Sequence, residues 1–239
     1  LDAEDGVFTP EQIHAVCHDA DLHRPGTGLV CLENTHNARG GLAIPVDRIR
    51  AAADAAHESD VPVHLDGARL FNACVALDVD PAEMVAPVDS VLFCLSKGLG
   101  APVGSVLAGS EAFVDEARRL RKLHGGGMRQ VGIVAAPGLL ALENRTRLAE
   151  DHEHAARLAA GLDALDGLSV PTPETNIVVA DVSDAPFDAP AFVDACADRG
   201  VGCGAIDDAR VRFCTHLDVD RAAVETALDR IETICTGST

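Results

Sequence analysis

Short apolar runs alternate with a helix-forming stretch along the first half of the chain. Residues 28–33 and 61–65 are short and mostly apolar, and the alanine-rich residues 47–59 between them have the spacing of an amphipathic helix. Further apolar runs follow at 90–95 and 105–108. Because parallel strands need a crossover connection, this strand–helix–strand order predicts parallel strands covered by helices. We therefore expect an α/β fold with a mainly parallel sheet.

The second half of the chain has a different pattern. One long helix is expected over residues 133–154, broken or bent near Pro137 and leading out of the first domain. Beyond it the pattern predicts strands at 168–170, 176–181, 201–203 and 211–214, and helices at 190–199 and 221–234. That order is typical of a smaller α+β domain. We interpret the chain as a large domain over residues 1–145 and a small C-terminal domain over residues 146–239.

Lysine is almost absent from the chain, which contains only Lys97 and Lys122. Lys97 lies on a glycine-flanked turn directly after the apolar run at 90–95. A lysine amine can form a Schiff base with a carbonyl, most usefully with the aldehyde of pyridoxal phosphate, PLP. Taken alone, Lys97 has a simpler interpretation as a surface lysine beside a turn.

Asp66 follows the apolar run at 61–65 in the same way. A PLP site needs an anion against the ring nitrogen of the cofactor, because the protonated ring accepts electrons when a bond to the substrate's Cα breaks. In open α/β sheets, ligands bind just outside the carboxyl ends of strands, where Asp66 and Lys97 are both expected. Asp66 could instead cap a helix that starts near Ala68.

Four strings of residues carry a family resemblance. They are His64-Leu65-Asp66-Gly67-Ala68-Arg69, Ser96-Lys97-Gly98-Leu99-Gly100-Ala101-Pro102-Val103-Gly104-Ser105, Gly125-Gly126-Gly127-Met128-Arg129-Gln130 and Arg212-Phe213-Cys214-Thr215-His216-Leu217-Asp218. In this order they resemble the low-specificity L-threonine aldolases, which belong to the β-eliminating lyase group of PLP enzymes. The resemblance covers nearly the whole chain. It implies the fold of PLP-dependent transferases of fold type I, the aspartate aminotransferase type.

The resemblance also implies an activity and a set of site residues. A family member cleaves L-threonine or related β-hydroxy-α-amino acids to glycine and an aldehyde, with PLP as cofactor and a small amino acid as substrate. By resemblance, Lys97 is the catalytic lysine that binds the cofactor, and Asp66 and Arg69 also contact it. Arg69 and Arg212 correspond to the residues that bind the substrate carboxylate.

The residues around Arg212 leave its role open. Strand side chains alternate between faces, so Arg212 is expected on the face opposite Val211 and Phe213. A guanidinium there can bind a carboxylate through two parallel hydrogen bonds, or simply face solvent. The resemblance favours the carboxylate.

Lys122 and Arg129 flank the triple glycine at 125–127. Glycines let the backbone approach an anion closely, and cations beside them could hold a phosphate. The other basic residues of the helix expected at 111–124 are interpreted as a solvated face beside acidic neighbours. In the family, the matching Lys and Arg reach the cofactor site of a neighbouring subunit. The resemblance therefore implies a homodimer or homotetramer with its active site at the subunit interface.

His23 is the candidate general acid or base. An imidazole titrates near neutrality and could take the proton of the substrate's β-hydroxyl, directly or through water. A lone loop histidine is more often merely exposed. The catalytic role rests on the match to the family's histidine ahead of the segment at 32–35.

One departure from the family concerns the N-terminus. Family members begin earlier and carry a Gly/Ser/Thr-rich turn for the PLP phosphate and a histidine that stacks on the ring, and neither has a candidate before the helix-like residues 10–20. The chain is expected to be a fragment or an incomplete enzyme. Two alternatives stay open: another PLP-dependent β-eliminating lyase or racemase on the same scaffold, and a truncated inactive remnant with a structural or oligomer-forming role.

Net charge and cysteine content bear on the partners and the cellular compartment of the protein. A formal net charge of −19 argues against nucleic acid or an anionic membrane as partner, and together with the scarcity of lysine it favours a halophilic source. The eight cysteines include no C-x-x-C pair, which gives no metal-site spacing and suits a reducing compartment. No apolar run is long enough to span a membrane. We expect a cytoplasmic protein without a bound metal.

Overall fold

The computed structural model describes residue 3 and residues 6–236, and these divide into two compact units. Unit 1 comprises Leu1–His36 and Ala43–Thr146, and unit 2 comprises Asn37–Leu42 and Arg147–Thr239. The change of unit after Thr146 falls beside the boundary expected from the sequence. Residues 37–42 differ from that expectation, because they were assigned to the first domain and here belong to the second unit.

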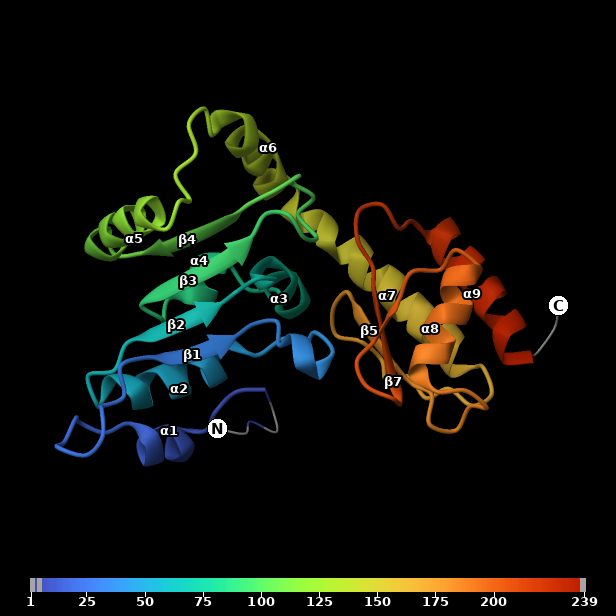
Figure 1. The fold of residues 1–239 in the computed structure, drawn as a ribbon, viewed down its shortest axis with the longest axis horizontal. Coiled ribbons are helices and arrows are strands. Elements are labelled where there is room, and N and C mark those ends of the chain that lie inside the picture. Colours follow the sequence, from blue (N-terminus) through green and yellow to red (C-terminus); the bar gives the residue numbers. More distant parts are fainter. Residues whose placement is uncertain (1–2, 4–5, 237–239) are drawn as a thin grey trace. The chain divides into compact units, whose positions relative to one another are not determined.

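Unit 1 is built on a four-stranded sheet with the order β1-β2-β3-β4. Its elements in chain order are α1 (Pro10–Val16), β1 (Val30–Glu33), α2 (Val46–His57), β2 (Val63–Asp66), α3 (Leu70–Leu77), α4 (Pro81–Val85), β3 (Ser90–Cys94), β4 (Ser105–Gly109), α5 (Glu111–Leu123) and α6 (Gly132–Glu143). Strands β1, β2 and β3 are parallel, and β4 is antiparallel to β3 at the edge (Figure 1). The prediction of an α/β fold with a mainly parallel sheet is confirmed.

The packing of α2 explains why the first crossover forms. Ala52, Ala53 and Ala56 of this helix are fully buried, and their small side chains let the helix lie close to β1 and β2. Val63 and Leu65 of β2 are also fully buried, whereas the residues between and after them are not. Burial of every second side chain in β2 and of the alanine side chains along one face of α2 thus specifies the same buried layer between strand and helix.

The expected long helix over residues 133–154 is wrong. The structure divides this stretch into α6, a 3-10 turn at Asn144–Arg147 and α7 (Leu148–Asp163). Pro137 lies inside α6 and does not end it. The break comes instead at polar residues, where the chain also passes from unit 1 to unit 2. Helix α3 was considered only as a helix that could start near Ala68, and helix α4 was not predicted.

Unit 2 pairs a three-stranded antiparallel sheet, in the order β5-β7-β6, with helices. Its elements are the 3-10 turn Asn37–Arg39, α7, β5 (Ile177–Asp181), α8 (Ala189–Asp198), β6 (Gly204–Ala205), β7 (Arg210–Cys214) and α9 (Arg221–Thr236). Helices α7, α8 and α9 share one apolar core with β5 and β7. Two expected strands differ: β6 lies at 204–205 instead of 201–203, and within 168–170 only Ser169 forms a bridge.

Among residue 3 and residues 6–236, no helix is long and apolar enough to cross a membrane.

Candidate active site

The carboxyl ends of β2 and β3 bring Asp66 and Lys97 to one edge of the unit 1 sheet. Asp66 is the last residue of β2 and pairs with Leu92 of β3. Lys97 follows the end of β3 at Cys94 by a short turn. The two strands are parallel, so their carboxyl ends share an edge, and both side chains are exposed there. This is the edge at which open α/β sheets bind ligands.

The carboxylate of Asp66 is tied to the turn that follows it. Its Oδ1 accepts a hydrogen bond from the backbone N–H of Ala68 at 3.0 Å, while α3 begins only at Leu70. The interpretation of Asp66 as the cap of a helix starting near Ala68 is therefore wrong, because Arg69 stands at the boundary of α3 and the Asp66 bond belongs to the preceding turn. That bond does not exclude a ligand, since a carboxylate has several acceptor positions. A Cβ on Gly67 would lie 2.8 Å from the carbonyl oxygen of Leu92. Only glycine fits this close approach of β2 to β3.

The turn that carries Lys97 is anchored by buried apolar residues. Leu95, Leu99 and Ala101 are buried, and the N–H of Ala101 donates to the carbonyl of Leu95 at 3.0 Å. The N–H of Gly100 donates to the carbonyl of Lys97 at 2.9 Å, and Gly100 has a φ of +82° that favours glycine. The buried residues hold the backbone while the amine of Lys97 extends outward.

Arg69 lies close to the same edge of the sheet. It stands at the N-terminal boundary of α3, three residues after Asp66, and is half-buried. Its carbonyl accepts the N–H groups of Asn72 at 3.0 Å and Ala73 at 3.3 Å, which fixes its backbone in the first turn.

The structure adds three residues that the sequence analysis did not assign to the site. Asn34, Thr35 and His36 follow the carboxyl end of β1, which is parallel to β2. The Asn34 side chain is buried: its Nδ2 donates to the carbonyl of Ile44 and its Oδ1 accepts the N–H of Ile44, both at 3.0 Å. The backbone N–H of Asn34 donates to the carbonyl of Asp66 at 2.9 Å. Thr35 Oγ1 and His36 Nδ1 are buried without a hydrogen-bond partner. Such atoms call for an explanation, and a bound polar group is one. The sequence could have indicated Asn34, Thr35 and His36 as site residues, because they directly follow the strand predicted at residues 28–33.

His23 is not brought to this edge. It is exposed on the loop that precedes β1, and its N–H donates to Asp21 Oδ1 at 2.7 Å. That loop enters β1 at Val30, its amino end, whereas Asp66 and Lys97 follow carboxyl ends (Figure 1). The expectation that His23 shares the site with them is therefore not supported within unit 1, because the two ends of a parallel strand lie on opposite edges.

Lys122 and Arg129 are also separate from this edge. Strand β4 is antiparallel to β3 and its last residue, Gly109, pairs with Ser90, so α5 starts beside the amino end of β3. Lys122 lies in the last turn of α5, and both cations are exposed. Within unit 1 they are not placed beside Lys97.

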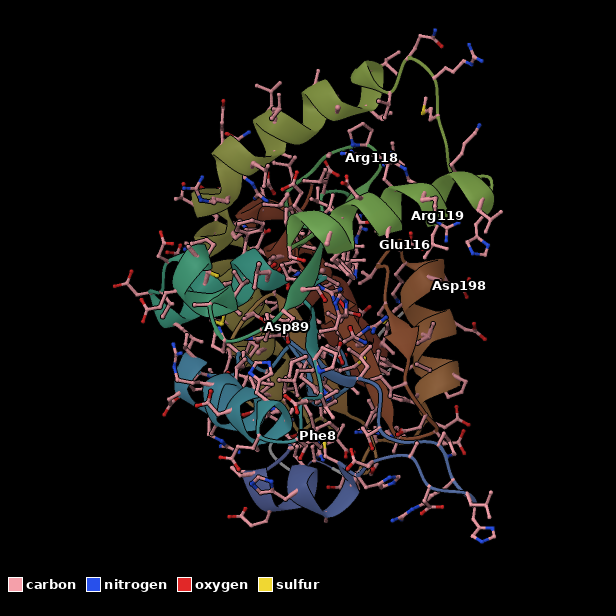
Figure 2. All side chains as sticks on the ribbon, turned by 90° about the vertical axis from the view of Figure 1, so that its left-hand side faces the viewer. Phe8, Asp89, Glu116, Arg118, Arg119 and Asp198 are labelled. Atoms are coloured by element: carbon pink, nitrogen blue, oxygen red, sulfur yellow. The ribbon has the colours of Figure 1, made fainter. Side chains whose placement is uncertain are left out.

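The remaining basic residues of α5 form a solvated face. Arg118 pairs with Asp115, with Nη1 and Oδ1 3.4 Å apart, and Arg119 Nε donates to Glu116 Oε2 at 2.8 Å. Figure 2 shows Arg118, Arg119 and Glu116 along this helix. The interpretation of this run as solvated and paired with acidic neighbours is confirmed.

In unit 2, Arg212 occupies the face of β7 that the sequence indicated. Val211 and Phe213 are buried in the apolar core, and Arg212 between them is half-buried on the other face. Its Nη1 donates to Asn37 Oδ1 at 3.3 Å. Asn37 directly follows His36 in the chain.

A cavity of about 930 Å³ opens within unit 2. Val179, which pairs with Arg212, lies in its wall together with Gly40 and Ile177, and charged groups come from Arg39, Glu174 and Arg210. The cavity mixes apolar and charged walls.

Comparison with known proteins identifies relatives of this chain. A family model for β-eliminating lyases matches residues 1–185. The chain is 42% identical over 237 residues to the probable low-specificity L-threonine aldolase 2 of Arabidopsis thaliana, covering 97% of the chain and 67% of that protein. It is 40% identical over 220 residues to the low specificity L-threonine aldolase of Escherichia coli, covering 92% and 64%. An alanine racemase of Cochliobolus carbonum is 34% identical over 229 residues, covering 90% and 56%. The chain thus spans about two thirds or less of these relatives.

Solved structures show the same fold. The threonine aldolase of Leishmania major superimposes with a TM-score of 0.77 at 19% identity, covering 98% of this chain and 69% of the other. The aspartate aminotransferase of Rhizobium meliloti gives 0.68 at 18% identity, covering 99% and 64%. The predicted fold of aspartate aminotransferase type is confirmed, as is the resemblance to threonine aldolases. With a family model matched over more than half its length, the chain belongs to the β-eliminating lyase family.

Proposed function

We propose that this protein acts as a PLP-dependent carbon–carbon lyase that cleaves L-threonine or a related β-hydroxy-α-amino acid to glycine and an aldehyde. The observation that carries the proposal is the placement of the Lys97 amine and the Asp66 carboxylate after neighbouring parallel strands. The names of the relatives from Arabidopsis thaliana and Escherichia coli supply the substrate class.

The residues at this edge fit the cofactor. PLP carries an aldehyde, a ring nitrogen and a ring hydroxyl, and the edge offers an amine, a carboxylate and two buried polar atoms without partners, Thr35 Oγ1 and His36 Nδ1. Lys97, Asp66 and Arg69 would hold the cofactor. When bound, PLP supplies an electron-accepting ring that weakens the substrate's Cα–Cβ bond.

The chain's own groups then bind and orient the substrate. The Asp66 carboxylate would lie beside the ring nitrogen, where an anion favours the protonated ring. Arg212 and Arg69 bind the substrate carboxylate, with Arg212 offering a planar pair of donors. Holding the carboxylate would restrict rotation of the substrate and so orient its Cα–Cβ bond for cleavage.

The proton of the substrate's β-hydroxyl needs an acceptor. His23 is the acceptor that the family resemblance implies, whereas His36 is the imidazole at the edge occupied by Asp66. We assign the role to His36, whose Nδ1 is buried and free of a hydrogen bond. Comparing His36→Asn with His23→Asn tests this: loss of aldehyde release in the first and near-normal release in the second is expected, and the reverse result returns the role to His23.

Oligomerisation is part of the proposal. Lys122 and Arg129 lie away from Lys97 in unit 1, and we propose that they reach the cofactor site of a neighbouring subunit in a homodimer or homotetramer. The exposed apolar residues Ile133, Leu139 and Leu140 of α6 support such an interface. Mixing a Lys97→Ala chain with a Lys122→Ala chain would then regenerate one intact site, and no recovery of activity would contradict the shared site.

We further propose a cytoplasmic protein adapted to high salt. With a net charge of −19, the acidic groups repel one another in dilute buffer. Salt at 0.1 M screens the repulsion between exposed charges that lie more than about 10 Å apart. The urea concentration at the midpoint of unfolding should rise as potassium chloride is added. A flat or falling midpoint would argue against the adaptation.

The decisive experiment uses the scarcity of lysine. Incubation with PLP followed by borohydride should fix a pyridoxyl phosphate group on one lysine, located by peptide mass spectrometry. Lys97→Ala should abolish the label, and Lys122→Ala, which changes the only other lysine, should keep label on Lys97. Label on Lys122 would overturn the assignment. No label at all would favour the inactive remnant.

A racemase is the second candidate, because the alanine racemase of Cochliobolus carbonum is also a relative. The same residues would serve removal of the Cα proton. The products distinguish the reactions: aldehyde from L-threonine supports the lyase, D-alanine from L-alanine supports the racemase, and ammonia with a keto acid indicates β-elimination.

A further inference from the structure

The cavity of unit 2 is not used by the proposed function. Its walls come from residues 38–40 and 42, the loop 169–174, β5 and the start of β7, all of which belong to unit 2. Arg212, the proposed ligand of the substrate carboxylate, does not line it and donates instead to Asn37. At about 930 Å³ the cavity is within the size range of small-molecule sites. It is therefore a candidate for a second binding site.

The floor of this cavity is the outer face of the unit 2 sheet. Along β5, Val178 and Ala180 are buried in the apolar core beneath the sheet. Strand side chains alternate, so Ile177, Val179 and Asp181 share the other face, and all three line the cavity. The floor is apolar over most of its length and becomes charged where the strand ends.

One wall is fixed against the floor by a buried contact. Thr175 Oγ1 donates to the carbonyl of Gly41 at 2.7 Å, and both residues are buried. A Cβ on Gly41 would lie 2.6 Å from this oxygen and 3.2 Å from Cβ of Ile177, so only glycine allows the approach. The segment 37–42 is thereby held on the sheet. The cavity is preformed, as ligand sites usually are.

Two opposite charges stand side by side at the charged end. Asp181 of β5 and Arg210 of β7 are cross-strand partners, and both line the cavity. Arg210 turns its Nε and Nη2 to Asp207 Oδ2, at 2.8 and 2.6 Å, and not to Asp181. Asp181 Oδ1 accepts the N–H of Ser183 at 2.8 Å. Nη1 of Arg210 is not used in its pair, and a carboxylate has acceptor positions beyond one hydrogen bond.

The charges of the cavity wall balance. Hydrogen bonds from the side chain and backbone of Ser183 lower the pKa of Asp181, so its carboxylate is ionised at neutral pH. Arg210 is always protonated. Arg39 and Glu174 add one further charge of each sign to the wall. A wall with equal numbers of positive and negative groups complements a ligand that carries both charges.

We propose that this cavity binds a free α-amino acid with an apolar side chain. The ligand carboxylate accepts from Nη1 of Arg210, and its ammonium group donates to Asp181. Its side chain lies over Val179 and Leu42, which are half-buried in the cavity wall. The site does not depend on the function proposed for Lys97, because every lining residue is in unit 2.

Isothermal titration calorimetry with L-leucine tests the proposal, and we expect saturable binding of a single molecule per chain. Three compounds each lack one part of the ligand: glycine lacks the apolar side chain, 4-methylpentanoate the ammonium group and 3-methylbutylamine the carboxylate. Each should bind at least about tenfold more weakly, since it leaves a partner in the cavity unmatched. Equal binding of any one of them, or no saturable binding of L-leucine, would overturn the proposal.

A polypeptide segment is the competing occupant of the cavity. N-acetyl-trileucine amide carries neither terminal charge and represents such a segment. We expect it not to displace L-leucine. If it binds more tightly than L-leucine, the cavity is a docking site for polypeptide and the amino-acid assignment is wrong.

Matched variants locate the binding. Arg210→Gln and Asp181→Asn should each weaken L-leucine binding at least about tenfold. Arg221→Gln is the control, because this arginine of α9 is 78% exposed and lies outside the cavity, and it should bind as the wild type does. Arg212→Gln should also bind normally. Loss of binding in the Arg212 variant with normal binding in the Arg210 variant would place L-leucine in the proposed substrate site and refute a second one. The compound series on the wild-type chain decides the matter even if a variant fails to fold.

Discussion

The helices of the two units differ in how many of their apolar side chains are buried. In unit 2, α7, α8 and α9 each bury apolar residues in a common core. In unit 1, α2 does the same, but α5 has no buried residue and α6 buries only Gly138 and Ala141. On α6, Ile133 is 75% exposed, Leu139 66% and Leu140 61%.

This contrast shows what each helix requires from its surroundings. Helices of unit 2 are amphipathic and need cover on one side only. Helix α6 carries a single charged residue, Glu143, and is apolar on all sides. A helix with that composition is normally buried all round. The exposed apolar face of α6 is compatible with the proposed subunit interface.

The largest expected effect comes from paired truncations in the two units. Phe192 is fully buried and stacks on Phe187 with ring centroids 5.1 Å apart, so Phe192→Ala should cost about 3–5 kcal/mol of the free energy of unfolding of unit 2. Ile133→Ala on exposed α6 should change the isolated chain by less than about 0.5 kcal/mol. Hydrogen exchange measured by mass spectrometry resolves the units. If both variants lost the same free energy of unfolding, the contrast between buried helices in unit 2 and the exposed helix α6 in unit 1 would be wrong.

A buried ion pair of unit 2 gives the next effect. Arg147 Nη1 and Nη2 donate to Asp151 Oδ1 and Oδ2 at 2.8 and 3.0 Å, and the Asp151 side chain is 1% exposed. Arg147→Ala leaves a buried charge without its partner and should cost about 3 kcal/mol. Arg119→Ala, which breaks the exposed pair with Glu116 in unit 1, is the control and should have no measurable effect. Urea unfolding followed by circular dichroism measures both.

The assembly prediction concerns α6 directly. Ile133→Asp would place a charge on its exposed apolar face, and we expect at least about a tenfold weaker association, equivalent to about 1.4 kcal/mol. Sedimentation velocity over a range of concentrations measures it. Leu22→Asp is the control, because Leu22 is 93% exposed but lies outside α6. Unchanged association in the Ile133 variant would place the interface elsewhere.

The smallest effect is a pH dependence of unit 2. Burial lowers the pKa of His152 below its ordinary value of 6.5, although nearby Asp151 opposes this. Between the two values the unfolded chain binds more protons, so stability is present above pH 6.5 and is lost as the pH falls through this window. His152→Gln should flatten the change in unfolding midpoint. An equally steep loss in that variant would assign it to other groups.

Much of unit 1 was predictable because its signals are local. The alternation of Val63 and Leu65 with polar neighbours predicts β2, and the small residues of α2 predict a close-packed crossover. The same reasoning placed Asp66 and Lys97 after strand ends. The break between α6 and α7 was missed, since the residues at 144–147 carry no proline or glycine that would announce it.

The sequence by itself therefore determined the strand–helix order, the family, and the residues that follow β2 and β3, because periodicity and strand ends are written in consecutive residues. Only the tertiary structure decided that Thr35 and His36 share the edge with Asp66 while His23 lies at the opposite end of β1. That choice depends on the direction and register of strands far apart in the chain, which no local pattern specifies.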